Sequence, residues 1–177
     1  MNAFRTTPVQ QAMSRLLHRL PRLAHHAHAA ETTRSGDVHL DDRLPSWLRD
    51  VAAQGLLAPL ADVEVQFGAL ADPDDLETFG DQWFRIDLTP GQAGYDDVVV
   101  ERLLSRYTPI GGSSTLIGST LAVSRDDEDH AVHEYNIESV YDEISDGRDP
   151  VSVVGPLFAD LAELLDSITD TRPAETM

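Results

Sequence analysis

The sequence predicts one small α+β domain, because short segments with strand-like alternation lie between segments with helical spacing. Residues 63–67 and 84–88 alternate apolar and polar side chains, which is typical of half-buried strands. Residues 44–54 and 157–168 repeat apolar side chains at helical intervals. With 177 residues and a hydrophobic fraction of 41%, the chain is long and apolar enough to form one core.

The first part of the chain differs in charge from the rest. Residues 1–35 hold five arginines and one glutamate, a net charge of +4, whereas the remainder holds eight arginines and 30 acidic residues, a net charge of −22. Leu16, Leu20 and their apolar neighbours recur at helical spacing among arginines, which indicates a short basic amphipathic helix that Pro21 interrupts. The following His-, Ala- and Thr-rich stretch is typical of a flexible linker.

We therefore expect residues 1–40 to form a basic flexible leader or an amphipathic helix, and residues 41–170 to form a single α+β domain. An arginine-rich, acid-poor amphipathic segment is also typical of organelle transit peptides, so the use of this leader stays open.

The elements of the domain follow from capping and turn signals. Asp41 or Asp42 is expected to cap the helix at 44–54, and Gly55 to end it. Gly155 and Pro156 mark the start of the last helix. In order, we expect a helix at 44–54, a strand at 63–67, a short helix at 74–79, a strand at 82–88 and a helix at 95–107. Strands at 115–124 and 130–137, joined by an acidic hairpin loop, and a helix at 157–168 are expected to follow. The tail is expected to fray from residue 169 and to be disordered at 171–177.

Composition excludes several function classes. The chain has no cysteine, which rules out disulfides, cysteine-ligated zinc, iron–sulfur clusters and thiol nucleophiles. No apolar run approaches the roughly 20 residues of a membrane-spanning helix, so we expect a soluble, cytoplasmic protein. A net charge of −18 repels phosphate backbones, so we expect no direct nucleic-acid binding and a basic protein as partner.

The histidines and glycines of the domain predict neither a metal site nor an active site. His130 and His133 lie three residues apart in an expected strand, so their rings face opposite sides. The acidic run 126–129 lacks the glycine and distal glutamate of a calcium loop and is typical of a solvated turn. Gly111 and Gly112 have no phosphate-loop spacing and indicate a tight turn into the next strand. We therefore expect no catalysis, no metal and no cofactor.

The tryptophans have different expected roles. Trp47 falls on the apolar face of its helix and is expected in the core. Trp83 and Phe84 are neighbours in a strand, so only one of them can face inward, and an exposed aromatic side chain among acids is a typical interface anchor.

Five fragments between residues 43 and 168 resemble, in order and spacing, the SUKH superfamily of fungal cell-wall-synthesis regulators and bacterial toxin-immunity proteins. They are 43–49 with its Leu-Pro helix start, 108–111 before a strand, 118–123, 131–135, and 153–161 with a closing strand and a Phe-containing helix. The chain departs from that family in having Gln54-Gly55 where Asn-Gly is usual, and in its basic leader. The resemblance implies a central, mainly antiparallel sheet with flanking helices and a binding role without catalysis.

In immunity proteins of this kind an acidic surface complements a cationic toxin, so the resemblance together with charge clustering predicts the partner-binding residues. They are Asp126, Asp127, Glu128, Asp129, Asp142, Glu143 and Asp146. A merely solvated acidic surface would explain the same clusters. Two other classes stay open: an acidic regulator or DNA mimic that binds a nucleic-acid-binding protein, with acids along one elongated face, and a small ligand-binding module or enzyme with a deep pocket.

Overall fold

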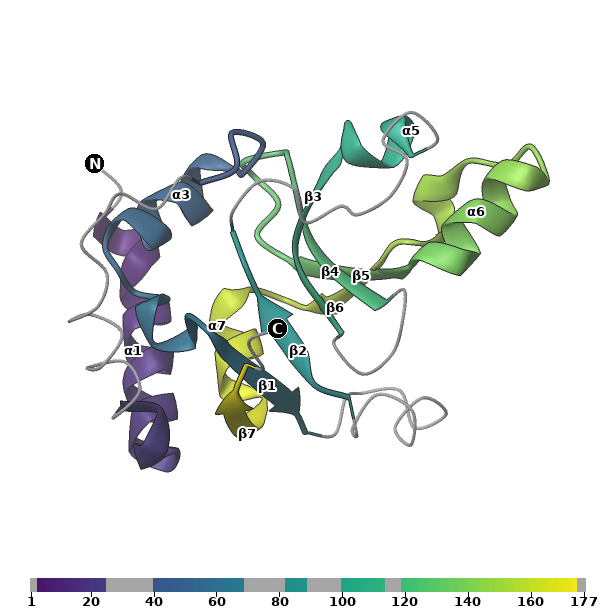
Figure 1. The fold of residues 1–177 in the computed structure, drawn as a ribbon. Coiled ribbons are helices and arrows are strands. Elements are labelled where there is room, and N and C mark those ends of the chain that lie inside the picture. The colour runs from purple at the N-terminus through teal and green to yellow at the C-terminus, as the bar shows by residue number, and fades with distance from the viewer. Residues whose placement is uncertain (1–2, 25–39, 69–81, 89–99, 114–118, 175–177) are drawn as a thin grey trace.

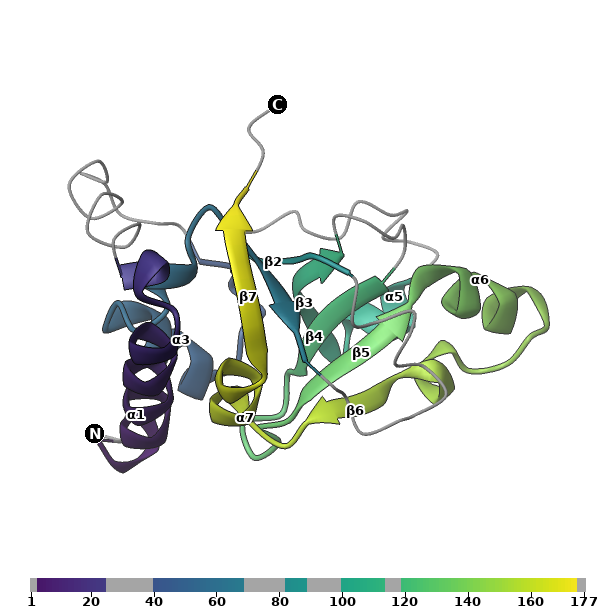
Figure 2. The same ribbon diagram turned by 90° about the horizontal axis from the view of Figure 1, so that it is seen from below.

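A computed structural model describes residues 3–24, 40–68, 82–88, 100–113 and 119–174, and in them seven strands form one antiparallel sheet (Figures 1 and 2). The strands are β1 (Val63–Phe67), β2 (Phe84–Ile86), β3 (Tyr107–Ser113), β4 (Ser119–Ser124), β5 (Val132–Asn136), β6 (Gly155–Phe158) and β7 (Ile168–Pro173). Their order is β6-β5-β4-β3-β2-β1-β7, so six strands follow one another as neighbours and the seventh returns to pair with β1. The predicted α+β class, with a mainly antiparallel sheet and flanking helices, is confirmed.

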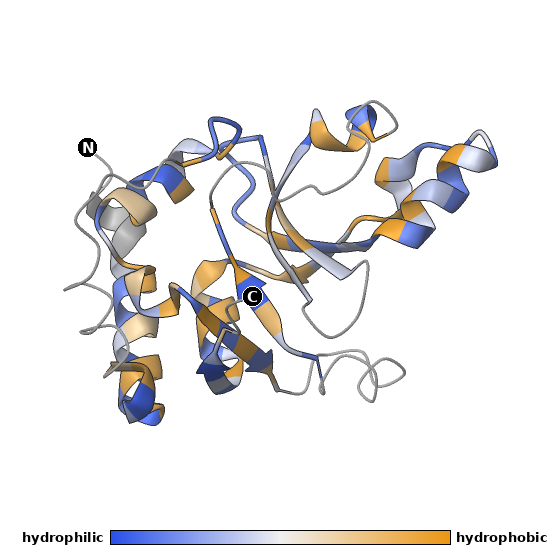
Figure 3. Cartoon of the chain, viewed as in Figure 1, coloured by the Kyte–Doolittle hydropathy of each residue, from blue (hydrophilic) through white to orange (hydrophobic). Residues whose placement is uncertain are grey.

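The sheet carries apolar side chains on both faces, as alternation along β4 shows. Leu121 and Val123 belong to the larger hydrophobic cluster, whereas Ala122 between them belongs to a smaller one. Helices α1 (Ala3–Arg19), α3 (Ser46–Ala53) and α7 (Leu161–Asp166) and the 3₁₀ turn η1 (Ala58–Leu60) contribute to the larger cluster. Helices α5 (Glu101–Leu104) and α6 (Ile137–Ser145) and the 3₁₀ turn η2 (Pro150–Val153) contribute to the smaller one. In Figure 3 the largely orange α7 lies between α1 and the sheet.

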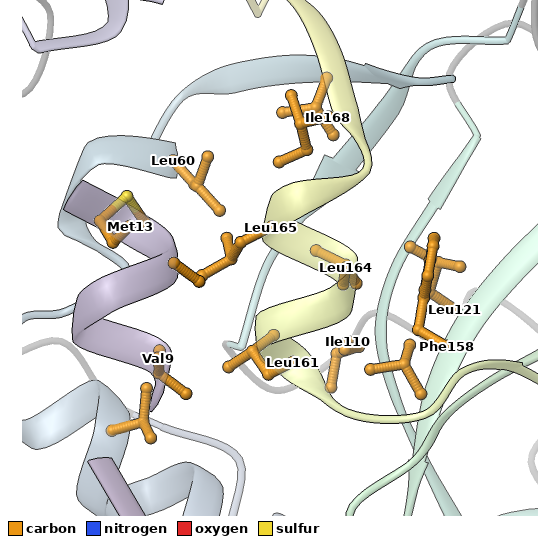
Figure 4. Close-up of a cluster of buried hydrophobic side chains, with 14 of the residues drawn as sticks. Val9, Met13, Leu60, Ile110, Leu121, Phe158, Leu161, Leu164, Leu165 and Ile168 are labelled. Carbon is orange, nitrogen blue, oxygen red and sulfur yellow. The ribbon is translucent and has the colours of Figure 1, made fainter. Parts of the chain in front are cut away.

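Helix α1 is part of the folded domain. Val9 and Met13 are buried and point toward Leu161 and Leu165 of α7 (Figure 4). The helix ends at Arg19, two residues before Pro21. The amphipathic-helix interpretation therefore matches the structure here. The folded unit begins well before residue 41, where the sequence favoured a flexible leader, and residues 25–39 lie outside the described part of the chain.

Helix α3 confirms the predicted 44–54 helix, and Gly55 follows it with a φ of 70°. Its predicted cap is wrong. Pro45 occupies the N-cap position and makes no side-chain cap bond. Instead, the Asp127 carboxylate accepts from the Ser46 N–H at 2.8 Å and from the Ser46 hydroxyl at 3.0 Å, so the hairpin loop between β4 and β5 supplies the cap.

The end of the chain differs most from its prediction. Residues 157–168 form the end of β6, a short α7 and the start of β7 instead of one helix. Asp160 accepts from the Glu163 N–H at 2.8 Å, which sets the start of α7 inside the predicted helix. Residues expected to fray or to be disordered pair with β1 as far as Pro173.

Two glycines sit inside β3 instead of forming a turn. Gly111 and Gly112 pair with β2 and β4, and a Cβ on Gly111 would lie 2.1 Å from the Arg85 carbonyl oxygen. The glycine is needed because the β2 backbone approaches closely here, next to a β-bulge in the pairing of β3 with β4. The same strand starts at Tyr107, so the predicted 95–107 helix is confirmed only for Glu101–Leu104.

The shorter strands follow their alternation, since β1 and β2 lie within the predicted strands and β4 and β5 lie within theirs. The predicted 74–79 helix and residues 95–99 and 115–118 lie outside the described residues.

Candidate functional site

The first predicted acidic group lies in the β4–β5 loop, and three of its four carboxylates accept hydrogen bonds from within the domain. Asp126 accepts from the Glu128 N–H at 3.0 Å, and Asp127 caps α3. Asp129 accepts from the Ala131 N–H at 2.9 Å, and its other oxygen lies 3.0 Å from His133 Nε2. Glu128 is exposed and makes no side-chain bond with the described residues. Asp126 and Asp129 therefore hold the hairpin in shape, although Asp126, Asp127 and Glu128 are all exposed.

The second predicted group lies at the end of α6 around one arginine. The Arg148 guanidinium donates to both Glu143 oxygens at 2.8 Å and to Asp146 Oδ2 at 3.0 Å. The hydrogen bond from Arg148 holds the pKa of the Glu143 carboxyl below its ordinary value. Glu143 is thus partly neutralised, whereas Asp142 is exposed and Asp146 shares its positive partner.

The structure does not bring these two groups together. The hairpin loop precedes β5 and α6 follows it, so the five residues of β5 separate them by about 17 Å of extended chain. Figure 1 shows α6 projecting from the molecule at the end opposite α1. A single partner surface made of all seven residues would have to span the length of β5.

Sequence reasoning missed one acidic residue that completes a row on α6. Glu138, Asp142 and Asp146 occur at four-residue intervals and are all exposed, so they form a ridge along one helix face. We call these three residues the α6 ridge. The signal was present in Asn136, which caps the helix by accepting from the Glu138 N–H at 2.9 Å.

The histidines take separate structural positions. The His130 ring stacks on Trp47 at 5.0 Å between centroids, and the His133 ring meets Tyr107 edge-on at the same distance. Trp47 is buried, as expected of a core residue. Among the residues that the structure describes, no three His, Asp or Glu side chains are placed to hold a metal ion.

The neighbours Trp83 and Phe84 differ in burial, as the alternation of the segment predicts. Phe84 is fully buried and packs against Phe67. Trp83 is half-buried and lies under the Arg172 guanidinium, 4.3 Å from its ring centroid, while Arg172 Nε donates to Glu64 at 2.6 Å. The tryptophan is therefore part of a polar network that joins β7 to its neighbours.

No protein-family model, curated protein or solved structure matches this chain. The SUKH resemblance accordingly stays an expectation from the sequence.

An open groove of about 720 Å³ lies between α1 and the segment that follows α3. Gln10, Gln11 and Ser14 line it from the helix, and Leu56 and Pro59 line it from the opposite side. None of its lining residues is acidic.

In the described part of the chain, no helix is both long enough and apolar enough to cross a bilayer.

Proposed function

We propose that the chain is a non-catalytic protein-binding domain of the immunity type, whose acidic α6 end binds a basic partner such as a cationic toxin. The observation that carries the proposal is the α6 ridge, three exposed carboxylates in a row on a helix that projects from the body. Carboxylates presented in this way pair with arginines or lysines of a partner and speed its association.

The position of these acids supports a role outside folding. Asp142 and Asp146 lie in or just after the last turn of α6, where the helix dipole disfavours anions by about 0.3–1 kcal/mol each. No basic residue lies in that turn. Arg148 donates hydrogen bonds to Glu143 and Asp146, whereas its interaction with Asp142 is only a longer-range charge attraction. Residues that oppose local stability are expected where a binding function requires them.

The β4–β5 loop has a smaller part in this proposal than the sequence predicted. Asp127 and Asp129 already accept hydrogen bonds from the domain, so a partner would have to compete for them. Glu128 is free to contribute an exposed charge. The antiparallel sheet with flanking helices agrees with the fold that the SUKH resemblance implies, and the lack of cysteine suits a cytoplasmic protein.

The test is recovery of a partner by a tagged chain from lysate of its own source, with elution by salt and identification by mass spectrometry. Three proteins are compared: the native chain, a ridge variant with Glu138→Gln, Asp142→Asn and Asp146→Asn, and a control with Asp42→Asn, Asp50→Asn and Glu101→Gln. The two variants change the net charge equally, at exposed sites. We expect one basic protein on the native chain and the control, and its loss from the ridge variant.

Other outcomes of this experiment would favour a different function class. A partner that itself binds nucleic acid would favour the acidic regulator or DNA mimic. Retention of a small molecule without any salt-sensitive protein would contradict the proposal and favour a ligand-binding module.

A further inference from the structure

Helix α1 has the apolar spacing and the positive charge that are typical of a helix bound in a groove of another protein. Its buried residues Val9, Ala12, Met13 and Leu16 fall at positions i, i+3, i+4 and i+7, and each is no more than 6% exposed. This is the anchor pattern of an amphipathic helix lying in a groove of another protein. Residues 1–24 contain four arginines and no acid, in a chain with 31 acidic residues.

The surface beneath α1 contacts both the apolar residues and the arginines of the helix. Leu161 and Leu165 of α7, with Leu60, lie opposite Val9 and Met13 (Figure 4). Arg15 makes a two-point ion pair with Asp166, at 3.0 and 2.8 Å. Arg19 donates to the carbonyl of Leu165, in the last turn of α7, and to the carbonyl of Ile168, the first residue of β7. The surface beneath α1 is thus apolar and ends in a carboxylate and two backbone carbonyl oxygens.

Departure of the helix from this surface would break no strand pairing in the described part of the chain. Among the described residues α1 forms no strand pairing, and its main contacts are with α7 and α3. Residues 25–39 join it to the rest of the chain. One side of the helix lines the open groove of about 720 Å³ beside Leu56 and Pro59. The surface that α1 occupies therefore has room beyond the volume of α1 itself.

We propose that the surface formed by α3, η1 and α7 is a docking groove for basic amphipathic helices, which α1 fills within its own chain and a helix of a partner protein fills in its place. The partner helix carries apolar residues at i, i+3, i+4 and i+7 and an arginine positioned for Asp166. The groove lies at the end of the molecule opposite the α6 ridge. The inference therefore does not depend on the proposed function.

The probe is a fluorescent peptide of residues 3–24 of this chain, titrated into full-length protein. Because the chain has no native cysteine, Gln11→Cys, at a residue that lines the groove from α1, and Gln54→Cys, next to the lining residue Gly55, introduce a unique pair of exposed thiols. A flexible bis-maleimide bridges them and tethers α1, whereas N-ethylmaleimide caps them and leaves α1 free to exchange. Both samples carry the same substitutions.

We expect the peptide to bind the capped protein and to bind the bridged protein about ten-fold more weakly or worse, because tethering reduces the fraction of empty groove. A peptide with Arg15→Glu should bind the capped protein about five-fold more weakly than the native peptide. Raised salt should lower the affinity of the native peptide for the capped protein. Mutation of the α6 ridge should have no effect.

Equal binding to bridged and capped protein would place the peptide elsewhere and overturn the inference. No binding to the capped protein at the highest soluble peptide concentration would also overturn it, because α1 is then a permanent part of the core. If the capped protein is a dimer and the bridged protein a monomer, the occupant is α1 of a second copy, which overturns the assignment to a foreign helix.

Discussion

Arg15 and Asp166 form a two-point ion pair although 151 residues separate them in the chain. The pair joins the first helix to the last one, and both side chains remain about half exposed, at 52% and 41%. The hydrogen bond from Arg15 holds the pKa of the Asp166 carboxyl below its ordinary value. Exposed pairs of this kind contribute little stability, so burial of the apolar residues of α1 holds most of this contact together.

Arg19 should contribute more to stability than its exposure suggests. Replacing Arg19 by Met removes both hydrogen bonds to the Leu165 and Ile168 carbonyls, and we expect a loss of about 1 kcal/mol in the free energy of unfolding. Arg22→Met is the control, because Arg22 is exposed on the following turn. Urea titration measures both variants, and an equal loss for the two would contradict the assigned role.

Asp127 should behave as a helix cap although it lies 81 residues from the helix it caps. Asp127→Ala leaves the Ser46 N–H and hydroxyl without their acceptor, and we expect a cost of about 1 kcal/mol in thermal or urea unfolding. Glu128→Ala, at the next position, should change stability by less than about 0.5 kcal/mol. If the Glu128 variant were the less stable of the two, Asp127 would not be the cap.

The stability of the protein should depend on pH through Asp41. The Asp41 carboxylate is buried and accepts from the Arg43 side chain at 3.0 and 2.8 Å, and this hydrogen bonding lowers the pKa of Asp41. A lowered folded-state pKa means that the stabilisation is complete above the unfolded-state pKa of about 4 and is lost as the pH falls through the folded-state value.

Native protein should therefore exceed the Asp41→Asn variant in stability at neutral pH, and the difference should shrink below about pH 4. Urea midpoints measured for both proteins across this range give the difference directly. A gap that stays constant down to the acid-unfolding region would show that the ionised form of Asp41 is not what stabilises the fold.

Gly111 should tolerate no side chain. Gly111→Ala would place a Cβ 2.1 Å from the Arg85 carbonyl oxygen, so the strands must separate, and we expect a loss of about 3 kcal/mol or failure to fold. Gly155→Ala is the matched control, since a Cβ there meets no atom within 4 Å. Similar stability of the two variants, compared by thermal unfolding, would rule out this close approach.

Local patterns predicted the elements in which apolar residues mark one face of a strand or helix. The strand at 63–67 and the helix from Ser46 were predicted because a single face of each is apolar. The 157–168 segment was misread since Leu157, Leu161, Leu164 and Ile168 match a helical period and also fit two strand ends around one short helix. Only the pairing of β7 with β1, about 100 residues away, decides between these arrangements.

The candidate site was predictable in composition but not in arrangement. Charge clustering located both acidic groups, yet the sequence could not reveal that Asp127 reaches Ser46 or that Arg148 neutralises Glu143. Both contacts arise from tertiary packing or from a turn whose geometry the pattern does not specify. Glu138 of the α6 ridge was missed because helix 137–145 has only nine residues and its cap, Asn136, lies at the end of a strand.

The most direct test of the proposed function is the association rate of the recovered basic partner, measured against ionic strength for the native chain, the ridge variant and its charge-matched control. Exposed interface charges act mainly on the association rate and its salt dependence. We predict that the ridge variant associates more slowly and with a shallower salt dependence, while the control keeps the native rate and slope. Identical rates and slopes for all three proteins would show that the partner does not bind at α6.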